Sequence, residues 1–380
     1  SQFDGANGYQ PITTGPNYVA AGIPNKPLGG DVGILPICCP DISTGRVPVP
    51  NSAELGYPVA NQQLKRGYIQ SWNFIVEHRL PAEFVTSVGY VGTASVNGFA
   101  FLDVNASQIP GSGDDGRPLF QKFGRTATTR EFNGRTHSSY HSLQATLNRR
   151  MANGLFLKGA YTYSHSIDMA SYGDWTGFTW NAPSVFYRNR ATSNFDRAHM
   201  FQIGFLYEAP FGSGKKWATE GVPAMILGGW QFNGLFAAYT GAPFTVTSSG
   251  SSLNMPGNAQ TADQVKGDVG YMNKVGDDGT WFDTSAFARV TDVRFGNVGR
   301  NTLRGPGTAN VDLSLYRTFK LTEKFNVQFR AESFNLSNTP HFSNPNGSAN
   351  SSNFGKILST SSNSALGRSR EFRFGLRFGF

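Results

Sequence analysis

The chain has 380 residues, of which 15% are charged and 13% are aromatic, and its formal net charge is +8. A typical soluble globular chain carries about 25% charged residues, and a membrane helix needs roughly 20 consecutive apolar residues, a length that no apolar run here approaches. Any membrane contact must therefore be made by strands. The arginines are dispersed and form no basic run, so we expect no nucleic-acid partner.

Residues 1–65 are rich in Pro, Gly and Asn and have no sustained hydrophobic period, which predicts an extended arm or a long loop. The first ten residues lack the basic start and apolar stretch of a signal peptide, which leaves a removed signal or a start inside a longer precursor. Cys38 and Cys39 are neighbours and provide no intramolecular disulfide framework. They are either two free or buried thiols, or they form a vicinal or intermolecular bond.

Alternating hairpins begin after this arm, so we predict one antiparallel β-barrel segment over residues 66–380. In residues 67–80 the side chains of Tyr68, Trp72 and Phe74 share one face, and a tight turn leads into a second alternating strand at residues 84–93. The same unit recurs three times, and the middle one is looser. These units cover residues 140–151 with 155–166, 198–212 with 228–241, and 310–321 with 325–335.

The last strand has the clearest alternation in the chain. One parity holds only large apolar residues, and the other holds Glu, Arg and Gly. A period of two describes a strand with two different faces, and such an apolar face would lie against lipid in a membrane barrel. The apolar residues are Phe372, Phe374, Leu376, Phe378 and Phe380. We interpret them as the carboxyl-terminal signal by which outer-membrane barrels are recognised for insertion.

With this strand we predict an all-β, antiparallel, outer-membrane-type barrel segment of about nine strands, each near the ~10 residues that a tilted membrane strand requires. The predicted connections alternate in length. Short turns are expected at residues 81–83, 152–154 and 322–324, and long connections rich in Gly, Ser, Asn and Asp at 94–138, 167–197, 241–309 and 337–368. Short turns on one side and long loops on the other are typical of outer-membrane barrels.

Six segments between residues 66 and 380 also resemble a known family. They look like the carboxyl-terminal barrel half of Oar-like TonB-dependent transporters, which carry a carboxypeptidase-regulatory-like domain at their front. The resemblance implies a barrel of about 22 strands with a plug in its lumen. The regulatory domain, the plug, the energy-coupling motif and over half of the strands have no counterpart in this sequence. The segments are YIQSWNFIVEHRL…FVTSVGYVGT, YHSLQATLNRRMANGLFLKGAYTYSHSID, NFDRAHMFQIGFLYEAPFGSGKK, LGGWQFNGLFAAYTGAPFTVT, FGNVGRNTLRGPGTANVDLSLYRTFKL and VQFRAESFNLSNTPHF.

No catalytic or cofactor site follows from the sequence, so we expect a protein that is not an enzyme. The stretch GSGDDG at residues 111–116 matches a dinucleotide-binding pattern but lacks a surrounding strand–turn–helix, and its aspartates would repel a pyrophosphate. His137 and His141 would lie about 13 Å apart on a strand, too far to share a metal. We expect no bound metal in the strands, and calcium in the Asp-rich loops at Asp114–Asp115 and Asp277–Asp278 stays open.

Two functions remain after these exclusions. The first is a structural, self-assembling protein of the outer membrane, cell surface or extracellular space, because nine strands taken from a larger barrel leave two open edges, near Tyr68 and near Phe380. Copies would then join into rings or filaments, with Tyr68, Trp72, Phe74, Cys38 and Cys39 as candidate contacts. The second is the carboxyl-terminal part of an intact transporter, in which the missing strands come from its own precursor. In either case the lipid of the outer membrane is a partner if the segment inserts.

Overall fold

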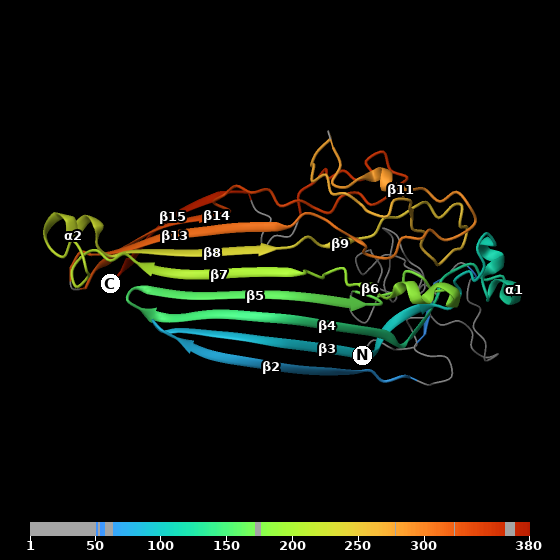
Figure 1. Cartoon of the computed structure of the whole chain (residues 1–380), viewed down its shortest axis with the longest axis horizontal. Helices are drawn as coiled ribbons and strands as arrows, with labels where there is room; N and C mark the ends of the chain where they lie inside the picture. Colours follow the sequence, from blue (N-terminus) through green and yellow to red (C-terminus); the bar gives the residue numbers. More distant parts are fainter. Residues whose placement is uncertain are drawn as a thin grey trace, which may run out of the picture.

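A computed structural model describes residues 51, 54–57, 64–171, 176–277, 279–322, 324–361 and 369–380. Nine long strands form one antiparallel meander in which each strand pairs with the next long strand along the chain (Figure 1). This confirms the all-β antiparallel segment that the alternation predicted. The strands are β2 (Tyr68–Leu80), β3 (Phe84–Asp103), β4 (Thr129–Ala152), β5 (Leu155–Asp168), β7 (His199–Glu208), β8 (Trp230–Tyr239), β13 (Thr308–Lys320), β14 (Asn326–Phe334) and β15 (Glu371–Gly379).

The remaining elements are short and lie in or beside the connections. The α-helices are α1 (Phe120–Phe123) and α2 (Gly221–Leu227), and three 3-10 turns cover Gly113–Gly116, Pro183–Asn189 and Thr284–Ala286. None of the helices in the described residues is long and apolar enough to cross a membrane. The short strands are β1 (Leu55–Tyr57), β6 (Ala191–Thr192), β9 (Pro243–Phe244), β10 (Asp263–Gln264), β11 (Phe287–Ala288) and β12 (Leu303–Arg304).

The register places the apolar parity of neighbouring strands on one face of the sheet. Phe74 of β2 is opposite Tyr90 of β3, which is opposite Leu143 of β4 and, one strand further, Tyr163 of β5. Directly opposed residues of an antiparallel pair point to the same face. These apolar side chains are exposed, as expected for a face that meets lipid. We call this the outward face.

The other face of the sheet is the lumen face, and it is more polar. Ser142 of β4 and Ser164 and Ser166 of β5 lie on this parity and are buried. Arg149 is an exception among the charged side chains, because it is opposite Phe84 and Leu157 on the outward parity. Its Nε donates to the carbonyl oxygen of Ala82 at the adjacent turn (2.9 Å), so the charged group lies at the rim of the sheet.

Two boundaries differ from the sequence prediction. The connection expected at residues 94–138 is shorter, because β3 and β4 remain paired as far as Asp103 and Arg130, past a bulge at Gly98. The apolar residues of this paired region run consecutively from Phe99 to Leu102 and do not alternate. Ala100 packs against Met169 and Phe178 of the long connections, while the rings of Phe99 and Phe101 lie beside Phe132. The segment Leu55–Tyr57, within the predicted arm, forms the short strand β1 and pairs in parallel with Thr129–Glu131 of β4.

The hydrophobic core lies in the long connections rather than in the sheet. The described residues of 104–128, 169–198, 240–307 and 335–361 pack together at one end of the strands, and we call them the loop layer (Figure 1). Its largest buried cluster surrounds Phe282, whose ring centroid lies 5.8 Å from that of Phe244, 5.7 Å from Phe287 and 5.4 Å from Phe354. The long connections therefore form a folded layer with its own core.

Replacing Phe282 with Ala tests whether this layer is a separate unit. Loss of a fully buried Phe side chain costs about 3–5 kcal/mol, and the aromatic contacts that disappear lie inside the layer. We expect faster hydrogen exchange across residues 240–307 with unchanged protection in β3, β4 and β5, measured by mass spectrometry of the full chain. The matched control is Val293→Ala at an exposed position of the same connection. Equal loss of protection in the strands would contradict an independent layer.

Candidate functional site

A buried ion pair joins the loop layer to the lumen face of the sheet. Asp168 is the last residue of β5 and shares the parity of the buried Ser164 and Ser166. The Nη2 group of Arg300 donates to Oδ1 and to the main-chain oxygen of Asp168, and the Ser171 hydroxyl donates to Oδ2 (2.8 Å). The side chains of Arg300 and Asp168 are only 8% and 6% exposed. Arg300 is therefore held at the mouth of the lumen.

The residues that follow Arg300 attach the same connection to the chain beside β6. The Asn301 side-chain amide donates to the carbonyl oxygen of Thr192 and to Oδ1 of Asn194, both at 2.6 Å. The Arg304 guanidinium donates to the buried carboxylate of Asp196. Burial, with a further contribution from the positive charge of Arg304, lowers the pKa of the neighbouring Arg197. The mouth therefore holds more guanidinium groups than its two carboxylates neutralise.

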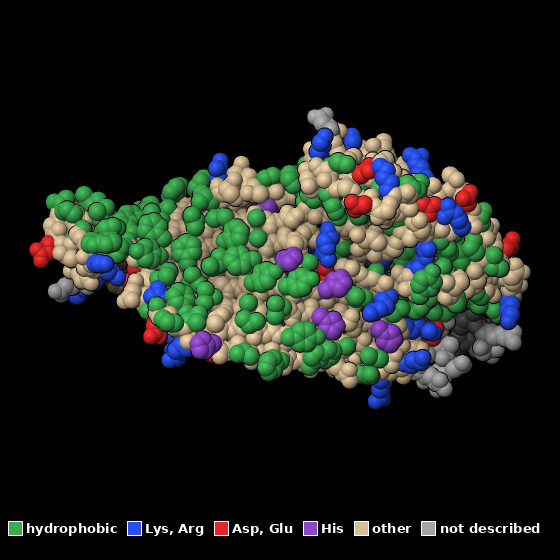
Figure 2. Space-filling view, viewed as in Figure 1, with side chains coloured by type: hydrophobic (Ala, Val, Ile, Leu, Met, Phe, Trp, Pro, Cys, Tyr) green, Lys and Arg blue, Asp and Glu red, His purple; other side chains and the backbone are tan. Residues whose placement is uncertain are grey.

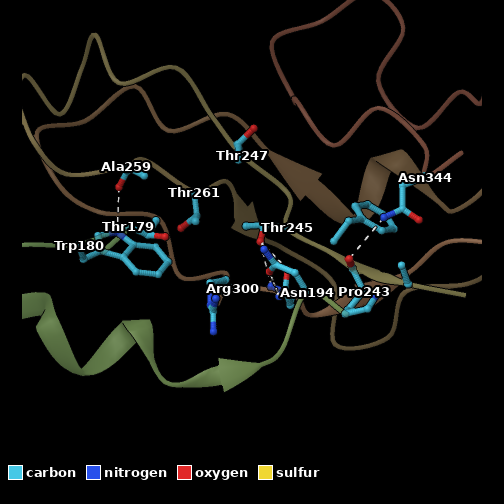
Figure 3. Close-up of a pocket in the computed structure, with 13 residues that line it drawn as sticks. Thr179, Trp180, Asn194, Pro243, Thr245, Thr247, Ala259, Thr261, Arg300 and Asn344 are labelled. Carbon is cyan, nitrogen blue, oxygen red and sulfur yellow. Dashed lines mark hydrogen bonds between the residues drawn. The ribbon is translucent and has the colours of Figure 1, made fainter. Parts of the chain in front are cut away.

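Two cavities adjoin at Arg300 and Asn301. The first has a volume of about 490 Å³ and is rich in hydroxyl and amide groups, with Trp180 and Phe244 as its main apolar surfaces. Figure 3 shows Trp180 and Thr261 beside this space, with Arg300 below them. Its lining consists of Thr179, Trp180, Asn194, Ala242, Pro243, Phe244, Thr245, Thr247, Ala259, Thr261, Arg300, Asn301 and Asn344.

The second cavity, of about 740 Å³, is lined by three arginines and, among the described residues, by no Asp or Glu. These are Arg188, Arg190 and Arg300. The Arg188 guanidinium stacks near Phe295 (5.3 Å to the ring centroid), and its Nη2 donates to the carbonyl oxygen of Gly296 (2.8 Å). Its Nη1 is buried and has no hydrogen-bond partner within the described part of the chain. Part of the hydrogen-bonding capacity of this lining residue is therefore unused within the described residues.

An exposed ion pair supports the loop layer away from these cavities. Arg294 donates from Nη1 and Nη2 to the two carboxylate oxygens of Asp263 (3.0 and 2.6 Å). These bonds hold the pKa of Asp263 below its usual value. The guanidinium of Arg294 is therefore already paired with a carboxylate. For Arg188 and Arg190 the structure records no carboxylate partner within the described residues.

The residues singled out from the sequence lie elsewhere. Tyr68, Trp72 and Phe74 are on β2, and Phe372, Phe374, Leu376 and Phe378 are on β15, with Phe380 just beyond its end, so the two groups occupy opposite edges of the sheet. Phe74 and Phe374 are 71% and 74% exposed. Cys38 and Cys39 lie outside the described residues. The two groups of edge residues are therefore not brought together within one chain.

Of the loop aspartates considered for calcium, Asp114 is paired with an arginine in the described structure. The Asp114 carboxylate accepts a bond from Nε of Arg117 (2.6 Å) within the 3-10 turn at Gly113–Gly116. Asp278 lies outside the described residues. No cluster of three or more His, Cys, Asp or Glu side chains occurs in the ranges that the structure describes.

The sequence analysis missed the arginine-lined mouth because its members are far apart in the chain. Arg188 and Arg190 come from residues 169–198, and Arg300 comes from residues 240–307. Both segments have the Gly, Ser and Asn content of ordinary loops, so only their packing together creates a concave site. The available signals were two closely spaced arginine pairs, Arg188 with Arg190 and Arg300 with Arg304, which the sequence analysis did not interpret.

Comparison with solved structures finds outer-membrane proteins of low sequence identity. The outer membrane transporter YddB from Escherichia coli is 8% identical, with a TM-score of 0.47 over 86% of this chain and 34% of that one. The ferripyoverdine receptor of the outer membrane of Pseudomonas aeruginosa is 11% identical, with a TM-score of 0.40 over 85% and 28%. The FrpB iron transporter from Neisseria meningitidis is 10% identical, with a TM-score of 0.40 over 85% and 32%. The chain thus spans about a third of the length of these structures.

The comparison with protein-family models identifies the family of this chain. No curated protein shows significant sequence similarity to the chain. A family model described as an outer membrane beta barrel domain, however, matches residues 2–373, which is nearly the whole chain. The nine-stranded antiparallel meander, with its exposed apolar face and its folded loop layer at one end, agrees with that match. The chain therefore belongs to the outer membrane beta barrel domain family and resides in the bacterial outer membrane.

Proposed function

We propose that this chain forms part of the wall and outer mouth of an outer-membrane transporter, and that its loop layer binds an anionic ligand. The observation that carries the proposal is the second cavity, where Arg188 and Arg190 have no carboxylate partner within the described residues and lie beside the Asp168-paired Arg300. The role is one of binding and passage, and no reaction is part of it. Membership of an outer-membrane barrel family supports this role, since the lumen of such a barrel can form a path across the membrane.

The placement of the cavities supports a ligand that enters from the long-loop side. Asp168 fixes Arg300 at the end of the lumen face of β5, so the cavities lie where the lumen opens. Arginine binds carboxylate and phosphate groups through parallel N–H donors. The adjoining hydroxyl- and amide-rich cavity would hold the uncharged polar part of the same ligand beside Trp180.

Binding of inorganic phosphate and citrate to the full chain in detergent micelles tests the ligand class. We expect the double variant Arg188→Gln/Arg190→Gln to weaken binding by about tenfold or more, because a hydrogen bond to a charged group contributes roughly 1.5–3 kcal/mol. Isothermal titration calorimetry measures the affinities. Arg190→Gln alone alters an exposed side chain and separates loss of binding from loss of folding.

The matched control is Lys122→Gln, which removes a positive charge from an exposed loop position outside the cavity lining. It should leave anion affinity unchanged. Equal affinity for glucose and citrate, or an unchanged affinity in the double arginine variant, would contradict an anion site.

Self-assembly into a structural surface protein is a second candidate function, favoured by the two ends of the sheet. Within the described residues, β2 and β15 each pair with one long strand only, so each leaves one edge open. Unpaired backbone groups in lipid cost several kcal/mol each. The edge strand β15 of one copy could pair with β2 of the next, giving a ring if the contact closes and a filament if it does not. Strands of a longer precursor would cover the same edges in a transporter.

Native mass measurement and electron microscopy of the purified full chain distinguish these outcomes. Self-assembly predicts rings or filaments whose abundance rises with protein concentration, since the contact is between copies. Exchanging both Cys38 and Cys39 for Ser should leave the assemblies intact if strand pairing, rather than a disulfide, holds them. A monodisperse monomer at all concentrations, with β2 and β15 paired to each other, would refute the second candidate.

A further inference from the structure

The connection between β7 and β8 differs from the others on its side of the sheet. The connections at residues 81–83, 153–154 and 321–325 are short turns, whereas residues 209–229 contain the helix α2. Figure 1 shows α2 beyond the ends of the strands, at the opposite end of the molecule from the loop layer. A longer insertion at this position needs a physical reason beyond the joining of two adjacent strands.

Two side chains of the outward face hold the carboxyl end of this helix. Trp230 of β8 is opposite Arg317 of β13, and Arg317 is opposite Phe329 of β14. Phe329 is in turn opposite Leu376 of β15, which lies on the exposed apolar parity. Opposed residues point to one face, so Trp230 and Arg317 both point outward, towards lipid.

The contacts from these side chains satisfy the last carbonyl groups of α2. Arg317 donates from Nη1 to the carbonyl oxygen of Ile226 (2.6 Å) and from Nη2 to that of Met225. The Trp230 indole also donates to the Ile226 oxygen (3.1 Å). Carbonyl groups at the end of a helix are otherwise left without partners. The helix is therefore attached to the lipid-facing side of the sheet, at its rim.

The helix presents apolar side chains away from these contacts. Val222 and Met225 are 63% and 69% exposed, and Ile226 and Leu227 are also exposed. The segment from residue 221 to 229 contains no charged side chain. In water this surface would be an unfavourable apolar patch. Figure 2 shows hydrophobic side chains gathered at this end of the molecule, with further hydrophobic groups on the adjoining sheet face.

The residues that precede α2 are of the types found at the boundary between lipid tails and headgroups. Trp217 is exposed, and the ammonium group of Lys216 lies 5.2 Å from the centre of a Trp217 ring. Lys215 pairs with Glu208 (2.7 Å), whereas the structure records no carboxylate partner for Lys216 within the described residues. Tryptophan favours the boundary between lipid tails and headgroups, and lysine favours the phosphate groups there.

We propose that α2, Trp217 and Lys216 form a foot that inserts into the lipid leaflet on the short-connection side of the barrel. The apolar side chains of α2 lie among the acyl-chain segments nearest the headgroups of that leaflet, and Lys216 lies at the level of the lipid phosphates. The occupant is lipid because the foot continues the apolar outward face, which already lies in the membrane. The foot sets the depth of the barrel wall, since Arg317 and Trp230 connect it directly to β13 and β8.

Lipid quenching of a fluorescent label tests the foot in the full chain reconstituted in phosphatidylglycerol vesicles. Cys38 and Cys39 are replaced by Ser, and a single bimane-labelled cysteine is introduced as Met225→Cys. Lipids brominated near the headgroup should quench this label more strongly than lipids brominated near the chain ends. Val88→Cys, at an exposed outward position of β3, should be quenched by lipid, and Val265→Cys in the loop layer should not.

Each contrary result overturns the proposal. If the Val88 label is quenched while the Met225 label stays in water, the foot lies outside the lipid. If the Met225 label is shielded from water without lipid quenching, a protein or a second copy covers the helix instead. If neither label is quenched, the outward face itself does not meet lipid, and the proposal fails with it.

The charge of Lys216 provides an independent measurement. Lys216→Gln should weaken partition into vesicles that contain anionic lipid by about fivefold, and should leave partition into zwitterionic vesicles unchanged. Lys122→Gln, in α1 at the loop-layer end of the strands, is the matched control and should not discriminate between the two vesicle types. Equal effects of Lys216→Gln on both vesicle types would contradict a contact with lipid phosphates.

Discussion

The in-register pairing of the long strands is the constraint on which the other features of this protein depend. A slip of one residue between β3 and β4 would turn Leu143 towards the lumen and Ser142 towards lipid. The observed register avoids this along the whole meander, so one apolar face results. The same register places Asp168 on the lumen side, within reach of the loop layer, and Arg317 on the outward side, at α2.

Arginine side chains make different contacts at the two ends of the strands. At the loop end, Arg300 is buried and needs the charge of Asp168, because a buried guanidinium without a partner is strongly unfavourable. A buried pair adds little net stability, since both charges lose hydration, so its main effect is to determine where the 240–307 connection meets β5. At the other end, Arg317 lies at the rim and satisfies main-chain carbonyl groups of α2. One arginine thus orients the 240–307 connection at the loop end, and the other orients α2 at the opposite end.

Alternation in the sequence was enough to predict the nine strands but not all of their limits. The apolar parity of residues 68–80 and 371–380 lies on the outward face through the register with β3 and β14, although both faces of these two edge strands are exposed. The outer parts of β3 and β4 escaped prediction, since their apolar side chains contact the loop layer and each other rather than lipid and therefore do not alternate along the strand. The helix α2 escaped as well: its short apolar run is neither alternating nor long enough to span a membrane.

By itself, the sequence determined the class of the molecule. The class is an antiparallel membrane barrel segment with short turns on one side and long connections on the other. It was predicted from the few charges, the abundant aromatic residues and the strict period of two. Only the tertiary structure decided that the long connections share a core around Phe282 and bring Arg188 and Arg190 to Arg300. The physical reason is range: a strand's faces follow from local alternation, whereas a cavity depends on contacts between residues more than a hundred positions apart, which no local pattern records.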